Sequence, residues 1–472
     1  MGSAPVFALA DDLSGAAEVA AVLMSSARPA RIALSGPPYA FTAPVVVADL
    51  DCRYRDEAGE LVRQALRHAG DRRVFVKIDS LLRGDLAATA AATLHTATPH
   101  DVVVRDAACC DAADRDAAVR DAVVRDVAVL DASASLAPAG GPPRAAHLTA
   151  PALVVLAPAL PAAGRVTVGG VPYVGGLSLR ETRAWQVERR PAPASITEAL
   201  GGVPSALVPL AAVRAGRDSL ARTLSRTAGR IAVCDAETDA DLGAIVGAAL
   251  VADHRTRFIG AGGLASALGR FLDANPPCGG TPDLHPPSSP RAGTMDTQVP
   301  ARSRARGTGN RPLLVVVGTA EPAAAEQARL LLSYGAHPVT LDAATDLDAT
   351  PARRAHLAQR LREALHPPVA VVVLTVRGQA PPTAAATLAG IVGAALTGDA
   401  PAPDLVLTGG ETARRVLDAL QVRELTPVGQ IHHGAVHCHT LRGRSVVTRP
   451  GSFGDRDSLL RIAAHLAPER LT

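Results

Sequence analysis

Lysine is almost absent from this sequence, and aromatic residues are scarce. The 472-residue chain has 48 lysine and arginine residues, of which only Lys77 is a lysine, and its aromatic content is 2%. Nucleic-acid surfaces combine basic side chains with aromatic side chains that stack on bases, so this composition argues against a nucleic-acid partner. The formal net charge of +3 is also small for this length and does not indicate a polyanionic partner.

Paired cysteines and long apolar runs are missing as well. The six cysteines include no C-x-x-C pair, which argues against a structural zinc site. No apolar run approaches the roughly 20 residues of a membrane span. The N-terminus also lacks the basic segment and apolar run that mark a signal peptide. We therefore expect a cytoplasmic protein with reduced thiols and no membrane partner.

Length and patterning predict an α/β fold with two domains. A chain of 472 residues exceeds what one core supports. Short apolar runs that end in charge or glycine alternate with alanine-rich helical stretches, as in parallel sheets. We expect two three-layer α/β domains with mainly parallel sheets and a ligand cleft between them. The domains are expected at 1–270, with a low-complexity insertion at about 99–150, and at 312–472, after a Pro/Gly/Arg-rich linker or insertion at 271–311.

Charged residues directly follow two predicted strands of the first domain. The strands are 6–10 and 74–78, and the charged residues after or at their ends are Asp11, Asp12, Lys77, Asp79 and Arg83. In open α/β sheets, ligands bind outside the carboxyl ends of the strands. We therefore expect these side chains to converge on one crevice.

The single lysine stands out within this group. An ammonium is a compact point charge and a guanidinium is a planar fork, so the two do not substitute for each other at a tight site. The plainer alternative is a surface lysine beside Asp79. Asp12 can also cap the following helix, but a cap does not explain two adjacent carboxylates.

Glycine turns mark the second domain. After the predicted strand at 404–408, Gly409 and Gly410 lead through Glu411 and Thr412 into a helix. Backbone N–H groups of such a turn form an anion cradle, and Glu411 can cap the helix or meet phosphate through Mg²⁺. A second turn with Gly451 and Gly454 follows the last strand, and two such turns indicate a nucleotide with several phosphates. A histidine-rich stretch at 432–439 has no ligand spacing typical of a metal site, so we predict none.

Seven motifs, in order and over most of the chain, resemble the four-carbon acid sugar kinase family. They are Ala10–Ala16, Lys77–Gly84, Ala157–Arg165, Asp235–Leu242, Gly260–Ala265, Thr408–Thr412 and Gly451–Gly454. The resemblance implies ATP-dependent phosphorylation, with Mg²⁺, of a threonate, erythronate or 3-oxo-tetronate type of acid on its terminal hydroxyl. It implies that the first domain holds the acid and the second holds ATP.

The resemblance also assigns roles to residues. It implies that the residues that bind the acid are Arg53, Arg83 and Arg165. The catalytic residues that it implies are Asp12, Asp11, Lys77 and Asp79. Among the carboxylates we favour Asp12 as the general base over Asp11 and Asp79. On the ATP side it places Thr319, Gly409, Gly410, Glu411, Thr412, Gly451 and Gly454.

Three positions depart from the family pattern. Ser14 replaces a threonine, Thr319 replaces a serine, and Arg449-Pro450 replaces Lys-Ser. The last change leaves one alternative open, a catalytically impaired regulatory protein that binds sugar acid and nucleotide. A nicotinamide-dependent oxidoreductase is disfavoured because no strand is followed by G-x-G-x-x-G. The oligomeric state stays open, with a homodimer as the candidate.

Overall fold

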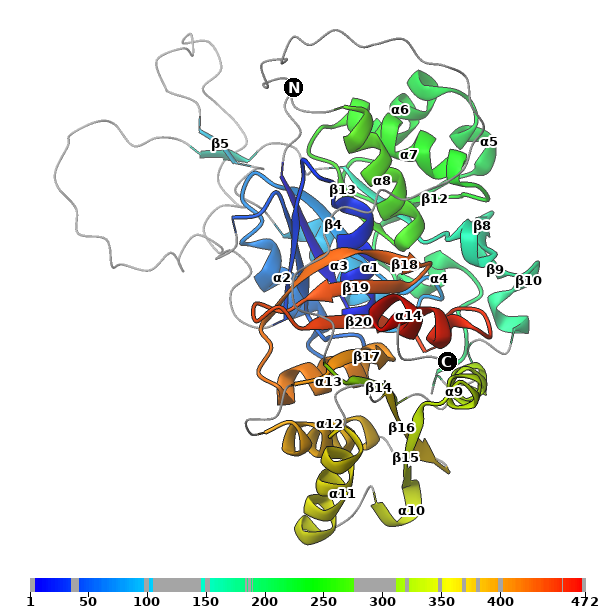
Figure 1. Cartoon of the computed structure of the whole chain (residues 1–472). Helices are drawn as coiled ribbons and strands as arrows, with labels where there is room; N and C mark the ends of the chain where they lie inside the picture. Colours follow the sequence, from blue (N-terminus) through cyan, green and yellow to red (C-terminus); the bar gives the residue numbers. More distant parts are fainter. Residues whose placement is uncertain are drawn as a thin grey trace, which may run out of the picture.

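The structure is a computed structural model in which the two halves of the chain follow each other along one long sheet (Figure 1). The residues that it describes are 5–34, 42–96, 102–104, 146–148, 153–182, 185, 188, 190–275, 311–318, 322–346, 350–366, 371–378, 383–397, 402–451 and 453–468. The predicted low-complexity insertion and linker therefore lie almost wholly outside the described residues, and Thr319 lies outside them too.

The N-terminal half contains eight strands of the sheet, in the order β11-β12-β7-β13-β4-β1-β3-β2. All neighbouring pairs within this half are parallel. Its helices and strands are β1 (Val6–Ala10), α1 (Leu13–Leu23), β2 (Ala30–Ala33), β3 (Val45–Asp49), α2 (Ala58–Leu66), β4 (Arg73–Lys77), α3 (Leu86–His95), β5 (Val102–Val104), β6 (Ala146–Leu148), β7 (Val154–Ala157), β8 (Arg165–Val168), β9 (Val171–Val174), β10 (Leu177–Ser178), α4 (Ile196–Ala199), β11 (Ser205–Val208), α5 (Leu210–Val213), α6 (Arg217–Ser225), β12 (Ile231–Cys234), α7 (Asp239–Ala252), β13 (Arg257–Gly260) and α8 (Gly262–Ala274), with short 3₁₀ turns η4 (Pro161–Ala163) and η5 (Leu179–Glu181).

The C-terminal half continues the sheet in the order β18-β19-β20-β17-β14-β16-β15. Only the pairs that involve β19 are antiparallel within it. Its elements are β14 (Leu313–Val317), α9 (Pro322–Ser333), β15 (His337–Asp342), α10 (Ala343–Asp346), α11 (Pro351–Ala364), β16 (Val371–Arg377), α12 (Ala384–Ala395), β17 (Asp404–Thr408), α13 (Gly410–Ala419), β18 (Glu424–His432), β19 (Ala435–His439), β20 (Ser445–Arg449) and α14 (Ser458–Leu466).

Helices cover both faces of the sheet. Along β1, Val6, Ala8 and Ala10 belong to the core under α1 and α8, whereas Phe7 and Leu9 belong to the core under α2 and α3. Successive strand residues point to opposite faces, so a fully apolar strand such as β1 serves two cores. The predicted α/β fold with mostly parallel strands is confirmed.

The join between the halves differs from the expectation of separate sheets. Strand β18 begins antiparallel to β2, with Glu424 opposite Ala33 and Leu425 opposite Ile32, so one 15-stranded mixed sheet runs through both halves. The first hydrophobic core accordingly extends from α1 and α8 to α12 and α13. No local sequence pattern indicates this join.

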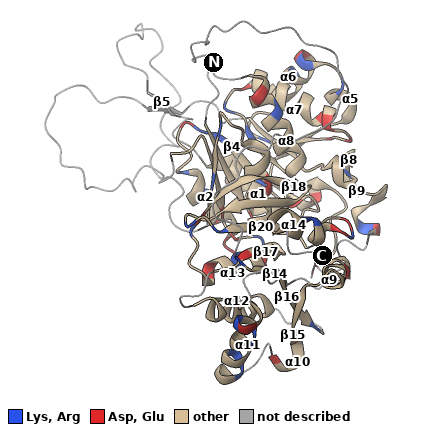
Figure 2. Cartoon of the chain, in the orientation of Figure 1, with Lys and Arg blue, Asp and Glu red and all other residues tan. Residues whose placement is uncertain are grey.

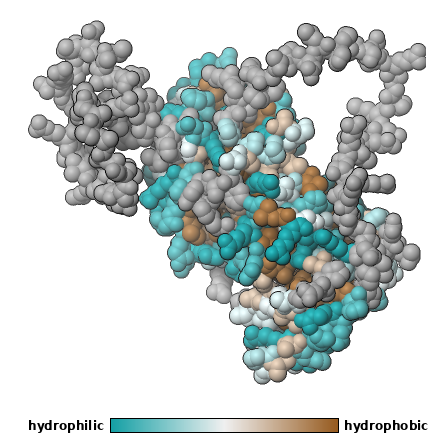
Figure 3. Space-filling view, turned by 60° about the vertical axis from the view of Figure 1, so that its left-hand side comes forward, coloured by the Kyte–Doolittle hydropathy of each residue, from teal (hydrophilic) through white to brown (hydrophobic). Residues whose placement is uncertain are grey.

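The surface carries interspersed charges and only scattered apolar patches. Acidic and basic residues are both scattered over the two halves in Figure 2. The face seen in Figure 3 is mostly hydrophilic, with hydrophobic patches near its middle. Among the described residues, no helix has the length and hydropathy to cross a membrane.

Candidate active site

The predicted site residues of the N-terminal half lie at one edge of the sheet. Strands β4, β1 and β3 are parallel neighbours, and Ala10 pairs with Lys77 on one side and with Asp49 on the other. Their carboxyl ends therefore open onto the same edge. The structure brings together there the predicted residues Asp11, Asp12, Arg53, Lys77, Asp79, Arg83 and, through Ser80, Arg165.

Arg53 joins the two adjacent carboxylates. Its Nε and Nη2 donate to the two oxygens of Asp11 at 2.8 and 2.9 Å, and its Nη1 donates to Oδ2 of Asp12 at 2.8 Å. The other oxygen of Asp12 accepts the N–H of Gly15 at 2.7 Å and caps α1. Asp12 therefore combines the capping role with a place in the charged cluster.

The pKa values of Asp11 and Arg53 reflect their burial and their mutual attraction. Burial raises the pKa of Asp11, and the Arg53 guanidinium acts against that rise. Burial lowers the pKa of Arg53, but Asp11 and Asp12 outweigh it and hold that pKa well above its ordinary value. Arg53 is therefore a permanent cation that fixes the orientation of both carboxyl groups.

Lys77 is buried, and its partner is a residue that the sequence did not reveal. Its Nζ lies 3.3 Å from Oε2 of Glu18 and donates to the carbonyl of Ile78 at 3.1 Å. Burial lowers the pKa of Lys77, but Glu18, Asp11 and Asp12 reverse this and raise it. The available signal was that Glu18 is the only charged residue of the apolar helix α1, and a buried lone acid needs a cation.

Asp79 is held as an ion by its own loop. Arg83 donates to both of its oxygens at 2.8 Å, and the N–H of Leu81 donates at 3.1 Å. Burial raises the pKa of Asp79, but Arg83, Arg53 and Arg165 outweigh burial and hold it well below its usual range. Asp79 thus shapes the loop after β4 and orients Arg83.

This loop also needs a glycine. Gly84 has φ +86°, and a Cβ at this position would lie 2.8 Å from the carbonyl oxygen of Arg53. Only glycine both adopts this conformation readily and permits so close an approach. The close contact presses the loop after β4 against the loop after β3, which carries Arg53.

Arg165 reaches from the N-terminal half to a loop of the C-terminal half. Its Nη1 donates to the hydroxyl of Ser80, and its Cζ lies 5.4 Å from the ring centroid of Phe453. Its buried Nε has no hydrogen-bond partner among the described residues. Burial lowers the pKa of Arg165. This guanidinium therefore keeps an unused donor where the two halves meet.

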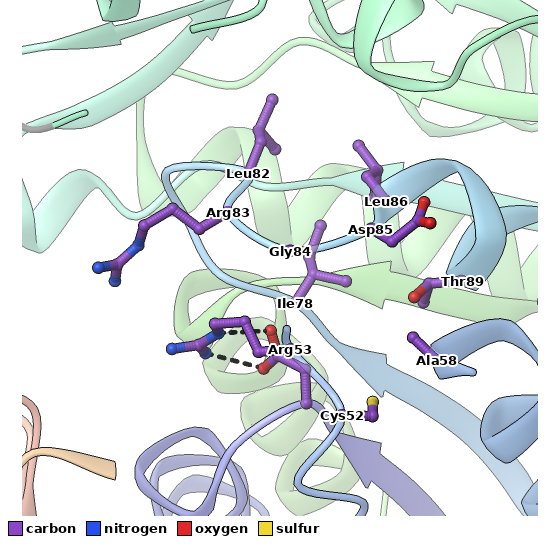
Figure 4. A pocket seen from close by; sticks show the side chains of 11 residues that line it. Cys52, Arg53, Ala58, Ile78, Leu82, Arg83, Gly84, Asp85, Leu86 and Thr89 are labelled. Carbon is purple, nitrogen blue, oxygen red and sulfur yellow. Dashed lines mark hydrogen bonds and ion pairs between the residues drawn. The ribbon is translucent and has the colours of Figure 1, made fainter. Parts of the chain in front are cut away.

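A pocket opens between the loop after β3 and the loop after β4 (Figure 4). Figure 4 shows the guanidinium groups of Arg53 and Arg83 pointing to the same side, while apolar groups such as Leu86 and Ala58 line the opposite wall. This pocket lies within the N-terminal half. The predicted cleft between the domains stays a prediction.

The first glycine turn of the C-terminal half lies against Asp12. Gly409 has φ +93°, and its N–H donates to the carbonyl of Arg449 at 2.9 Å. A Cβ on Gly410, at the start of α13, would lie 2.5 Å from Oδ2 of Asp12 and 3.0 Å from Oγ of Ser14. Residues almost 400 positions apart in the sequence thus lie side by side at the N-terminus of a helix.

The other predicted nucleotide residues that the structure describes lie in the first turn of α13 and in the loop after β20. Thr412 is buried and packs closely against Gly318, and Glu411 is exposed in the first turn of α13. Gly451 and Gly454 belong to the loop that follows β20 and carries Phe453.

Arg449 holds the loop that contains Gly451 and Gly454 through hydrogen bonds. It is 1% exposed and donates to Gln327, to Ser458 at 3.1 Å, and to the carbonyl of Phe453. Burial lowers its pKa to about 10. These partners are all uncharged, and within the described part of the chain no acidic side chain hydrogen-bonds to this cation. The arginine that departs from the family pattern is therefore a tether of the loop.

The histidine-rich stretch forms the hairpin of β18 and β19. His437 meets His439 and His465 edge to face, with ring centroids 5.0 and 5.5 Å apart. In the described part of the chain, no group of three or more His, Cys, Asp or Glu residues is placed to hold a metal ion.

Comparisons with known proteins match both halves. The model of a sugar-binding N-terminal domain matches residues 6–115 and 117–268, and the model of a nucleotide-binding C-terminal domain matches residues 314–459. A D-threonate kinase of Cupriavidus necator is 30% identical over 96% of this chain and 95% of its own length.

Two solved structures share the fold. A Salmonella typhimurium LT2 protein, provisionally described as a tRNA synthase, aligns over 98% of this chain and 99% of its own with a TM-score of 0.66 and 18% identity. A Haemophilus influenzae protein aligns over 98% of this chain and 100% of its own with a TM-score of 0.61 and 16% identity.

Proposed function

Because this chain belongs to the four-carbon acid sugar kinase family, we propose that it transfers a phosphoryl group from ATP to the terminal hydroxyl of a four-carbon sugar acid. The acid is of the threonate, erythronate or 3-oxo-tetronate type, and D-threonate is the first candidate because a relative is named for it. Residues 1–270 bind the acid, 312–472 bind ATP, and 271–311 link the two.

The close approach of Gly410 to Asp12 carries this proposal. The turn before α13 offers backbone N–H groups at a helix N-terminus, which is an anion site. The carboxylate that it faces belongs to the other half of the chain. A phosphate bound at this turn and a hydroxyl bound at Asp12 would be neighbours, as phosphoryl transfer requires.

The arginines around the pocket supply cations for the carboxylate of the acid. Arg53 and Arg83 use only part of their five N–H groups for their partners, and Arg165 has an unpartnered Nε. Guanidinium groups bind carboxylates through two parallel hydrogen bonds. The ion pairs within the site hold these arginines in place before the acid binds, so little ordering is required on binding.

Asp12 is the base that we propose for the accepting hydroxyl. Its carboxylate is oriented by Gly15 and Arg53 and lies at the turn proposed for phosphate. Asp79 is less suited because Arg83 engages both of its oxygens and its pKa is held low. Both oxygens of Asp11 and of Asp12 have hydrogen-bond partners, so Asp12 is preferred over Asp11 because Asp12 is the one that lies against Gly410. A positioned carboxylate takes the hydroxyl proton as the new bond to phosphorus forms.

The residues present also fit Mg²⁺ carried by the nucleotide. Mg²⁺ is held by one or two carboxylates together with substrate phosphates, and a dedicated cage of protein ligands is not needed. Glu411, exposed in the first turn of α13, is the carboxylate placed to meet it. Bound there, Mg²⁺ would neutralise phosphate charge.

Release of ADP by the purified protein tests this function. The assay uses ATP and Mg²⁺ with D- and L-threonate, D- and L-erythronate and their 3-oxo relatives. We expect ADP release that depends on one of these acids, and a phosphorylated acid in equal amount. Nucleotide binding without ADP release for any acid would contradict the proposal and favour the regulatory alternative.

The buried position of Arg449 weakens the motive for that alternative. The departure Arg449-Pro450 was its main support, but Arg449 ties the loop that carries Gly451 and Gly454. Arg449 therefore has a structural role in this loop, which supports a functional nucleotide side. Whether the enzyme acts as a homodimer stays a prediction.

A further inference from the structure

Two ion pairs outside the predicted site connect α13 to the loop after β3. Nη1 of Arg414 lies 3.0 Å from Oδ2 of Asp49 and also donates to the carbonyl of Asp49 at 3.3 Å. Nη1 of the next residue, Arg415, lies 3.0 Å from Oδ2 of Asp51. The two pairs cross between the halves of the chain, because α13 belongs to the C-terminal half and β3 to the N-terminal half.

The first of these pairs is built into the interior. The side chain of Asp49 is fully buried, and its second oxygen accepts the N–H of Asp51 at 3.1 Å. Arg414 is further held by Asp418, one turn along α13, at 3.0 Å. Asp51 itself adopts φ +46°, which is unfavourable for a residue with a side chain and indicates that the surroundings impose the shape of this loop.

The other end of the same loop holds the two carboxylates of the candidate active site. The N–H groups of Cys52 and Arg53 both donate to the carbonyl of Asp11, at 3.0 and 3.2 Å. The side chain of Arg53 then engages Asp11 and Asp12. Residues 49–53 therefore have α13 at one end and the proposed base at the other.

The contacts close a ring. Helix α13 meets Asp12 directly at Gly410, and it meets Asp12 a second time through Arg414, Asp49 and Arg53. On the basis of the proposed function, we propose that Asp49 and Arg414 are positioning residues that fix the phosphate-facing turn of α13 relative to Asp12. Neither lines the pocket or belongs to the glycine turns, so they act on how the two ligands are aligned.

If the pair has this positioning role, breaking it should lower kcat and leave the KM values for both ligands nearly unchanged. Each half keeps its own binding groups when the pair is broken, so both ligands still bind. The distance between the γ-phosphate and the accepting hydroxyl is no longer fixed, and a shift of about 1 Å can reduce the rate by about 100-fold. A purely structural pair would instead change stability and leave both constants near their wild-type values.

The test compares Arg414→Met and Asp49→Asn with Arg31→Gln as a matched control. Arg31 also connects the halves, through Glu424 at 3.6 Å and Thr426, but at the β2–β18 join. We expect kcat of Arg414→Met to fall about 10- to 100-fold with both KM values within about threefold of wild type. Arg414→Lys should recover part of the loss, and Arg31→Gln should retain kcat.

A double-mutant cycle decides whether the two residues act as a pair. Asp49→Asn with Arg414→Met should cost no more in kcat than the worse single variant, because the second change removes nothing further. Additive losses, an unchanged kcat in Arg414→Met, or an equal loss in Arg31→Gln would each overturn the proposal. Unfolding midpoints of all variants identify any that have lost the fold, and Arg414→Lys then supplies the comparison.

A readout without turnover keeps this proposal separate from the proposed function. Nucleotide binding to α13 should slow amide hydrogen exchange of Cys52 and Arg53 in the wild type, and Arg414→Met should abolish that slowing. If no acid in the panel supports ADP release but this difference is seen, the substrate assignment fails and the connection between α13 and the loop stands. If exchange at 52–53 does not respond to nucleotide in the wild type, the connection fails.

Discussion

In the N-terminal half of the site, charged side chains are paired with one another before any ligand binds, whereas the C-terminal half relies on glycine turns and on a buried arginine with uncharged hydrogen-bond partners. Asp11, Asp12 and Arg53 form one cluster, and Lys77 pairs with Glu18. On the other side, the partners that the described residues offer to Arg449 are uncharged, and one of them belongs to the second glycine loop.

The difference follows from what each side is proposed to bind. A site distinguishes a small acid with several hydroxyls from similar acids by the placement of its side chains, so those side chains must be held rigidly. A polyphosphate needs many N–H groups and positive potential, which turns and helix N-termini provide without charged side chains. The acid side of the site is thus preorganised by ion pairs. On the nucleotide side, the negative charge of the bound phosphates would balance the positive potential of the turns and helix N-terminus.

The largest effect is expected where the two halves meet, at Asp12. Asp12→Asn keeps the shape but removes the proposed base, so kcat should fall by about 1000-fold. ATP binding, measured by calorimetry, should be unchanged because the nucleotide groups lie in the other half. Turnover within a few-fold of wild type would remove Asp12 from this role.

Replacement of the only lysine, Lys77, should mainly lower the free energy of unfolding. Lys77→Met leaves the buried carboxylate of Glu18 without its cation, which typically costs about 3–5 kcal/mol of unfolding free energy. Adding Glu18→Gln to Lys77→Met removes the unpaired buried charge and should recover a substantial part of the lost free energy of unfolding. Chemical denaturation of the three variants checks this, and an additive double variant would show that the two residues do not form a pair.

A smaller loss is expected on the glycine side. Gly410→Ala places a Cβ against Asp12, so we expect kcat to drop about tenfold or more as the turn and the carboxylate move apart. Gly390→Ala, on the exposed side of α12 where a Cβ meets nothing within 4 Å, is the matched control. It should leave kcat unchanged and gain helix propensity. Equal kinetics for both alanine variants would contradict the close approach of the two halves.

The most gradual effect concerns the pH dependence of stability through Asp49, because it is spread over several pH units. Burial raises its pKa to about 7; Arg414 and the Asp51 N–H act against this rise, and Asp12 adds to it. Between about pH 4 and pH 7 the native state keeps a proton that the unfolded chain has lost. Stability should therefore fall as pH rises through that window, by at most about 1.4 kcal/mol per unit, and Asp49→Asn should lack this component. Identical slopes in denaturation series of the two proteins would contradict it.

Much of the acid side could be predicted from the sequence because one rule governs it. Parallel strands end at one edge, so residues that follow β1 and β4, such as Asp11, Asp12 and Asp79, had to come together there. Ser80 was not predicted because only the fold brings Arg165 to it. Glu18 was missed because one acid in an apolar helix gives no spacing pattern.

The contacts between the halves were beyond reach for a different reason. The approach of Gly410 to Asp12 and the pairing of Arg414 with Asp49 depend on how α13 docks beside α1. That docking is set by the antiparallel join of β18 to β2, which no local pattern predicts. Two separate sheets were the natural expectation, and one shared sheet is observed instead.

The most direct test of the central claim, that one site is built by Asp12 and the turn at Gly409 and Gly410, is a crystal structure with a non-hydrolysable ATP analogue and the preferred acid. The account predicts the γ-phosphate at the N–H groups of the first turn of α13, because the Gly409 N–H donates to the carbonyl of Arg449. A hydroxyl of the acid should then lie within hydrogen-bond distance of Asp12 and in line with the phosphorus. A γ-phosphate held elsewhere, or an acid whose reacting hydroxyl faces Asp79, would contradict it.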